Sequence, residues 1–121
     1  MNVGIVGLGL IGGSMAKRVK TRTLHAVWGA DIDSETMTLA RLCGAIDGPL
    51  TDENLADCDL LLLALAPRSA VGWAQEHAER IARKTVVIDL CGIKRAVCRE
   101  LAPLARRHGF TYIGGHPMAG L

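Results

Sequence analysis

The fold of this chain is decided near its start, by the stretch Gly7-Leu8-Gly9-Leu10-Ile11-Gly12-Gly13-Ser14. It follows an apolar run at 3–6 and leads into a segment with helical spacing of apolar residues, which predicts a strand, a tight turn and a helix. Gly7 permits the turn, Gly9 lets the backbone approach an anion, and Gly12 lets the helix pack on the strand. Because amide N–H groups at a helix start face an anion, the stretch predicts a pyrophosphate site. The competing interpretation is a glycine turn that binds nothing.

An acidic residue follows at the distance that this kind of turn requires. Asp31 ends the next apolar stretch, 24–30, and stands 19 positions after Gly12. In dinucleotide-binding folds an acid at about this distance accepts hydrogen bonds from the ribose hydroxyls. Its charge repels a 2′-phosphate, so the sequence predicts NAD rather than NADP as the cofactor.

The rest of the chain alternates apolar strands with helical patterns. Strands are expected at 3–6, 24–30, a short piece near 45–46, 59–65, 86–88 ending at Asp89, and 110–113. Helices are expected at 10–20, from Asp33 or Ser34 toward Gly44, from Pro67 toward Lys84, and at about 93–107, where Pro103 bends or divides the helix; 48–54 and 114–121 are expected to be loops. This order predicts an α/β fold with a doubly wound, Rossmann-like parallel sheet in strand order 3-2-1-4-5-6 and a cofactor across strands 1 and 4.

The amino-acid composition limits the classes of protein to which this chain can belong. The 121 residues suit a single domain, 1–121, and 50% hydrophobic with only 3% aromatic residues implies an aliphatic core. A dispersed net charge of +2 argues against a nucleic-acid surface, and no apolar stretch is long enough to span a membrane. The four cysteines and four histidines lack metal-ligand spacing, so we expect no metal and reduced thiols in a cytoplasmic protein. The abrupt end at Leu121 suggests the front half of a longer chain.

Four stretches together resemble the prephenate dehydrogenase family, which includes arogenate and cyclohexadienyl dehydrogenases. They are Val3 to Ser14, Leu63-Ala64-Leu65-Ala66-Pro67, Asp89-Leu90-Cys91-Gly92-Ile93-Lys94 and Gly114-Gly115-His116-Pro117-Met118-Ala119-Gly120. The first is shared by many dehydrogenases, whereas the last is a hallmark of this family. The resemblance spans the whole chain but only the nucleotide-binding half of the family. It therefore implies a further helical domain, absent here, that dimerises and closes over the substrate.

The resemblance implies NAD-dependent oxidative decarboxylation of prephenate or arogenate, a step toward tyrosine. His116 matches the catalytic histidine of the family, and an imidazole with a near-neutral pKa suits a general base that takes the proton of the ring hydroxyl. Without the family loop around it, His116 reads as an exposed loop histidine. The residues expected to contact NAD are Gly7, Leu8, Gly9, Leu10, Ile11, Gly12, Asp31, Ala64, Leu65, Ala66, Pro67 and Asp89. The full-length protein is expected to form a homodimer.

Three residues that follow the strand expected at 86–88 allow more than one interpretation of their role: Cys91, Gly92 and Lys94. Lys94 falls in the first turn of a predicted helix, where a cation opposes the macrodipole, so either a substrate carboxylate or cofactor phosphate compensates it or the lysine is solvated. Many family members have Gly-Ser where this chain has Cys91-Gly92, and Gly92 lacks the serine hydroxyl thought to contact the substrate. Cys91 is interpreted as a packed thiol or as a reactive one.

Two other functions compete with the leading one. A different two-domain dehydrogenase of small hydroxy acids would share the glycine turn but would not need the loop of His116. A nucleotide-sensing module would bind NAD and catalyse nothing, because a fold does not specify a function. The sequence does not distinguish prephenate from arogenate, and it says nothing of inhibition by tyrosine.

Overall fold

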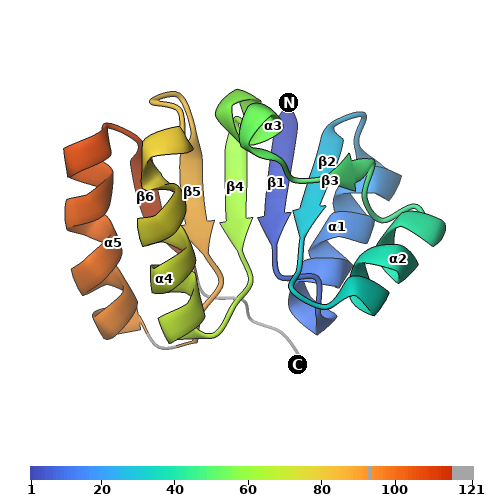
Figure 1. The fold of residues 1–121 in the computed structure, drawn as a ribbon, viewed down its shortest axis with the longest axis horizontal. Helices are drawn as coiled ribbons and strands as arrows, with labels where there is room; N and C mark the ends of the chain where they lie inside the picture. The colour runs from blue at the N-terminus through green and yellow to red at the C-terminus, as the bar shows by residue number, and fades with distance from the viewer. Residues whose placement is uncertain (93, 116–121) are drawn as a thin grey trace.

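The structure is a computed structural model that describes residues 1–92 and 94–115, and within them six parallel strands form one sheet in the order β3-β2-β1-β4-β5-β6 (Figure 1). The strands are β1 (Asn2–Val6), β2 (Ala26–Ala30), β3 (Gly48–Pro49), β4 (Leu60–Leu63), β5 (Val86–Asp89) and β6 (Thr111–Gly114). The helices are α1 (Leu10–Arg22), α2 (Ser34–Leu42), α3 (Asp52–Asp57), α4 (Pro67–His77) and α5 (Lys94–His108), with a 3₁₀ turn, η1 (Ala78–Arg80). The predicted doubly wound sheet and its strand order are therefore confirmed.

Two cores lie on the two faces of the sheet, because successive side chains of a strand point to opposite faces. In β4, Leu61 and Leu63 pack with α3, α4 and α5, whereas Leu62 packs with α1 and α2. In β1, Val6 belongs to the first cluster and Ile5 to the second. A strand that is buried on both faces in this way explains the continuous leucine run of β4.

The connection from α2 to β4 differs from the sequence-based expectation. The short strand lies at Gly48–Pro49 instead of 45–46, and Ala45 and Ile46 are buried in the core. The predicted loop at 48–54 was also wrong, because α3 begins at Asp52. Thr51 caps this helix: its side chain accepts a hydrogen bond from the N–H of Asn54, whose side-chain oxygen accepts one from the N–H of Thr51.

Several element ends also differ from expectation. The helix expected to continue past residue 81 ends at His77, and η1 follows it. Pro103 lies inside α5 without dividing it, whereas the predicted stop of that helix at Gly109 is confirmed, with φ +85°. The second strand begins at Ala26, whereas Leu24 is fully exposed.

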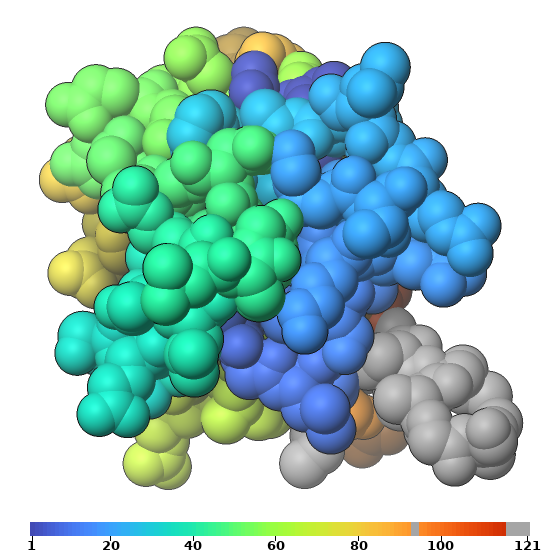
Figure 2. Space-filling view, turned by 90° about the vertical axis from the view of Figure 1, so that its right-hand side faces the viewer, coloured from blue at the N-terminus to red at the C-terminus, as the bar shows by residue number. Residues whose placement is uncertain are grey.

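α1 and α2 form the side of the molecule shown in Figure 2, in blue and blue-green. α2 has only Ala40 fully buried, and Leu39 and Leu42 are largely exposed, so this helix contributes little to the core. Its ends are well defined: the side chain of Asp33 accepts a hydrogen bond from the N–H of Glu35. Local capping therefore supports α2 where burial does not.

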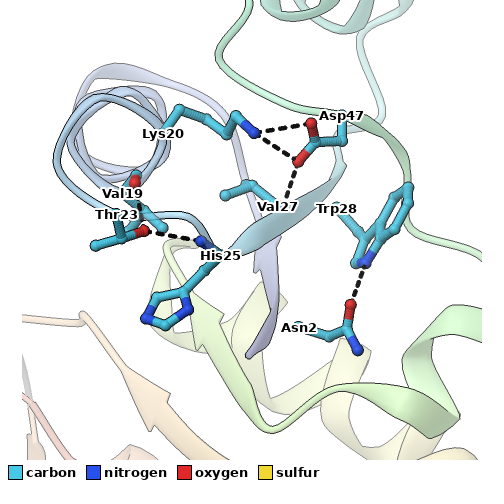
Figure 3. A network of polar contacts seen from close by, with 8 residues as sticks. All are labelled: Asn2, Val19, Lys20, Thr23, His25, Val27, Trp28 and Asp47. Carbon is cyan, nitrogen blue, oxygen red and sulfur yellow. Dashed lines mark hydrogen bonds and ion pairs between the residues drawn. The ribbon is translucent and has the colours of Figure 1, made fainter.

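A polar network ties the end of α1 to β2 (Figure 3). Lys20 Nζ lies 2.8 Å from Oδ1 and 3.0 Å from Oδ2 of Asp47, and the N–H of Val27 donates to Oδ2 across 2.7 Å. These bonds hold the pKa of Asp47 below its usual value, with the hydrogen bond from Lys20 as the largest cause. Among the described residues, no helix is long and apolar enough to cross a membrane.

Candidate functional site

The glycine turn between β1 and α1 is built by close backbone packing. Gly7 has φ +91°, and a Cβ atom there would collide with the carbonyl oxygen of Ala64. A Cβ atom at Gly12 would collide in turn with the carbonyl oxygen of Gly7. Both residues must therefore be glycine for α1 to start where it does, as the sequence predicted.

Gly9 differs from Gly7 and Gly12, because it faces open space. A Cβ atom there would meet no heavy atom within 4 Å. Gly9 is the N-cap of α1 and provides no side-chain cap, and the first turn of the helix carries no acidic residue. Leu10 and Ile11 are exposed in this turn. The start of α1 thus combines an uncapped helix end with free approach to the backbone, which suits an anion.

Asp31 follows β2 at the same edge of the sheet. Its Oδ2 accepts a hydrogen bond of 2.8 Å from the N–H of Leu8, and its Oδ1 accepts one of 2.9 Å from the N–H of Asp33. The side chain of Leu8 is buried in the core. The carboxylate predicted to bind a ribose is thus also part of the glycine turn.

A crevice of about 360 Å³ opens where the strand order reverses, beside the carboxyl ends of β1, β2 and β4. Such a reversal is the usual ligand site of open α/β sheets. The lining residues are Val6, Gly7, Ala30, Asp31, Ile32, Leu65, Ser69, Trp73 and Glu76. The predicted contacts Gly7, Asp31 and Leu65 are thus brought together at one hollow.

Three residues of α4 that line the crevice were missed by the sequence analysis: Ser69, Trp73 and Glu76. Their spacing of four and three places them on one helix face, which is the signal that could have found them. Trp73 stacks on His77 with ring centroids 4.1 Å apart and an interplanar angle of 14°. This stacking holds the indole against its own helix at the side of the crevice.

The predicted segment 64–67 is divided between two hollows. Leu65 lines the crevice, whereas Ala66 and Pro67 line a groove of about 800 Å³ between α4 and α5. Pro67 is the first residue of α4, as expected. The carbonyl oxygen of Ala64 packs against Gly7, so Ala64 supports the glycine turn through its backbone.

Asp89 lies at the end of β5 and is fully buried. Its Oδ1 accepts a hydrogen bond of 2.6 Å from the hydroxyl of Tyr112, and its Oδ2 accepts one of 3.1 Å from the N–H of Cys91. Burial, together with the bond to Asp89, raises the pKa of Tyr112 far above its usual value, so the phenol remains a donor. The side chain of Asp89 is thus directed into the core and bonded to β6 and to the chain after β5, and its contact with a dinucleotide stays a prediction.

The two predicted catalytic residues are placed only in part. Lys94 is the first residue of α5, as expected, and His116 lies outside the described residues. The cysteines carry no disulfide: Cys58 and Cys91 are buried, and burial raises the pKa of the Cys58 thiol to about 11. Within 1–92 and 94–115, no cluster of three potential metal ligands occurs.

The sheet reversal, the glycine turn and the acidic residue after β2 define a dinucleotide-binding domain of the Rossmann class. The family model described as prephenate dehydrogenase, nucleotide-binding domain, matches residues 15–121. The chain belongs to the prephenate dehydrogenase family. Because the match begins after the glycine turn, the turn and the family match are separate observations.

Relatives agree with this assignment. Prephenate dehydrogenase of Bacillus subtilis (strain 168) is 28% identical over 120 residues, which cover 96% of this chain and 32% of that protein. Prephenate dehydrogenase of Aquifex aeolicus, solved with hydroxyphenyl propionate and NAD⁺, has 29% identity and a TM-score of 0.85 over 100% of this chain and 43% of its own. Arogenate dehydrogenase of Synechocystis has 26% identity and a TM-score of 0.85 over 100% of this chain and 42% of its own. The chain thus spans less than half of each.

The fold extends beyond this family. The 3-hydroxyisobutyrate dehydrogenase of Mycobacterium tuberculosis has a TM-score of 0.87 with 21% identity, over 98% of this chain and 41% of its own. At that identity the similarity shows the fold alone. The sheet therefore cannot by itself separate a prephenate or arogenate dehydrogenase from a dehydrogenase of small hydroxy acids.

Proposed function

We propose that the chain binds NAD and forms the dinucleotide-binding half of an enzyme that oxidatively decarboxylates prephenate or arogenate. The observation that carries the proposal is the open space at Gly9 on the uncapped start of α1, at the same sheet edge as Asp31. A pyrophosphate fits the first feature and a ribose the second. Family membership and the NAD⁺ complex of the Aquifex relative support the same cofactor.

Different residues of the site bind different parts of NAD in this proposal. The backbone at Gly9, Leu10 and Ile11 binds the pyrophosphate, and the carboxylate of Asp31 accepts hydrogen bonds from a ribose. The crevice beside Leu65 and Trp73 receives the adenosine end, since Asp31 lines it. The segment 64–67 follows β4 and borders the part of the cofactor that leads to the nicotinamide.

In the proposed reaction, NAD supplies the hydride acceptor when it is bound. His116 takes the proton of the ring hydroxyl while a hydride leaves the carbon that bears it, which turns the alcohol into a ketone. Loss of carbon dioxide then makes the ring aromatic. Lys94, at the start of α5, neutralises an anionic group of the substrate or the cofactor.

The substrate half of the enzyme lies beyond the present chain in this proposal. The relatives are more than twice as long, and holding two reactants in near-attack geometry can contribute about 7 to 11 kcal/mol to catalysis. We propose that a helical domain following residue 121 provides this positioning and forms a homodimer. The cytoplasm is the proposed compartment, supported by four cysteines without a disulfide.

Calorimetry on the chain 1–121 and a steady-state assay of the full-length gene product test the proposal. The chain should bind NAD, and the full-length product should turn over prephenate, arogenate or both. No NAD binding overturns the cofactor assignment. NAD binding without turnover of either substrate favours a non-catalytic NAD module or another hydroxy-acid dehydrogenase. Turnover by the chain alone at about 1 to 1,000 per second would contradict the need for a second domain.

A further inference from the structure

One buried residue, Asp89, contacts both segments that lead to the predicted catalytic residues. The Oδ2 of Asp89 accepts a hydrogen bond from the N–H of Cys91, in the connection that precedes Lys94. The carbonyl oxygen of Asp89 accepts one of 3.0 Å from the N–H of Gly115, the residue before His116. Side chain and backbone of a single residue therefore hold both segments.

The contact at Gly115 is close enough to require glycine. A Cβ atom there would lie 2.6 Å from the carbonyl oxygen of Asp89 and 2.8 Å from the side chain of Ile88. The backbone after β6 thus packs directly on the end of β5. A shift of Asp89 would be transmitted to Gly115, since no side chain separates them.

Tyr112 holds this carboxylate in place from β6. Its hydroxyl donates to Oδ1 of Asp89 across 2.6 Å, and the Sγ of Cys98, from α5, lies 3.3 Å from the same hydroxyl. Through these two contacts, Tyr112 links β6 to β5 and to α5. A buried carboxylate that loses a donor is left partly unsatisfied, so loss of the Tyr112 hydroxyl is expected to displace the carboxylate of Asp89.

We propose that Asp89, held by Tyr112, is a positioning residue that fixes the chain segments carrying Lys94 and His116 relative to each other. The inference rests on the proposed function, because it assigns no chemistry to Asp89 itself. It is a role in addition to the predicted contact of Asp89 with the cofactor, and it rests on the burial and the hydrogen bonds of this residue.

A matched pair of variants separates positioning from simple stabilisation. Tyr112→Phe removes the hydroxyl at Asp89. Thr85→Val removes the hydroxyl of a fully buried residue just before β5, at the opposite edge of the sheet, where it donates to the carbonyl oxygen of Cys58 across 2.6 Å. Each substitution deletes one hydroxyl that donates to a fully buried residue, Asp89 or Cys58, and keeps the side-chain shape, so similar losses of stability are expected.

Kinetics of the full-length gene product and amide hydrogen exchange of the chain 1–121 provide the readouts. Tyr112→Phe should lower kcat about 10- to 100-fold with an unchanged KM for NAD, since a misplacement of about 1 Å can cost a hundredfold in rate. It should also speed exchange at the amides of Cys91 and Gly115 at least about tenfold. Thr85→Val should change none of these.

The outcomes distinguish this inference from the proposed function. An active wild-type enzyme in which Tyr112→Phe and Thr85→Val have the same kcat overturns the positioning role. If the wild type turns over neither substrate, the proposed function fails, and hydrogen exchange still decides whether Asp89 holds the two segments. In that case, the inference is overturned if the amide of Cys91 exchanges at the same rate in both variants, and the amide of Gly115 does so too.

Discussion

The backbone N–H of Leu8 donates a 2.8 Å hydrogen bond to Oδ2 of Asp31, across 23 positions of sequence. The bond joins the glycine turn to the end of β2. The carboxylate proposed to bind the ribose therefore also holds the turn proposed to bind the pyrophosphate. Asp31 couples the two parts of the dinucleotide site, and substitutions there should affect both.

Cofactor preference is the first consequence. The chain should bind NAD at least about tenfold more tightly than NADP, a difference of about 1.4 kcal/mol, because the Asp31 carboxylate repels a 2′-phosphate. Asp33 and Glu35 add negative charge close by in sequence. Isothermal calorimetry with both nucleotides measures the ratio. Equal or tighter binding of NADP would refute the role of Asp31.

Asp31→Ala should lower NAD affinity more than about tenfold and bring the two affinities close together, since the ribose acceptor and the support of Leu8 are both lost. Asp33→Ala is the control. It removes the cap of α2 and should cost about 1 kcal/mol in the free energy of unfolding, with NAD affinity nearly unchanged. Equal losses of NAD affinity in the two variants would contradict a specific contact between Asp31 and the ribose.

Substitutions in the glycine turn should separate folding from binding. Gly9→Ala should leave the melting temperature close to wild type, because the added Cβ meets nothing within 4 Å, yet it should weaken NAD binding about tenfold or more by obstructing the phosphates. Gly12→Ala should unfold or strongly destabilise the chain, because its Cβ collides with the backbone of Gly7. Gly72→Ala, equally open but inside α4, should leave NAD binding unchanged and should stabilise the fold by up to about 1 kcal/mol, because alanine favours a helix interior. Normal NAD binding by Gly9→Ala would argue against an anion at the start of α1.

His116→Asn in the full-length gene product should lower kcat about 100- to 10,000-fold, the usual range for loss of a general base, with little change in NAD affinity. The wild-type rate should fall as the pH drops through the pKa of the histidine, because the protonated imidazole cannot accept a proton. Stopped-flow or steady-state kinetics over pH 5 to 9 test this, about the range in which His titrates. Near-normal turnover by the variant would place the base elsewhere.

The network at Asp47 should make stability depend on pH in the acid range. The folded-state pKa of Asp47 is lowered from 3.8, so its contribution is present at neutral pH and is lost as the pH falls below about 4. Because the Asp47 side chain is 35% exposed, solvent screening limits the expected cost of Asp47→Asn at pH 7 to about 0.5 to 1 kcal/mol. Urea unfolding at pH 7 and pH 3 measures it.

Asp52→Asn is the control for that measurement. Asp52 pairs with Arg80 across 3.3 Å, but both side chains are about half exposed or more, so the variant should lose little at either pH. A cost of Asp47→Asn that stays the same at pH 3 would mean that the charge of Asp47 does not stabilise the fold.

The amino-acid sequence by itself determined the topology, which the structure confirms, and it predicted where the dinucleotide site lies. Gly7 and Gly12 specify a turn through their own backbone requirements, and the leucine run of β4 reports burial on both faces, so neither depends on knowing distant contacts. Asp31 could be located by counting from the turn. The helix α3 was missed, although Thr51 and Asn54 form a capping box that the sequence carries.

Tertiary structure alone decided which predicted residues share a surface. Leu65 and Pro67 are two positions apart yet line different hollows, because α4 begins between the crevice and the groove beside α5. Trp73 reaches the crevice because the fold brings α4 to the same hollow as Val6 and Ala30, at the carboxyl ends of β1 and β2. Asp89 is buried by partners 2, 23 and 26 positions away, namely Cys91, Tyr112 and Gly115. Burial and hydrogen bonding across the sheet depend on segments far apart in sequence, so local patterns could place Asp89 at the right edge but could not tell whether it faces a ligand or the core.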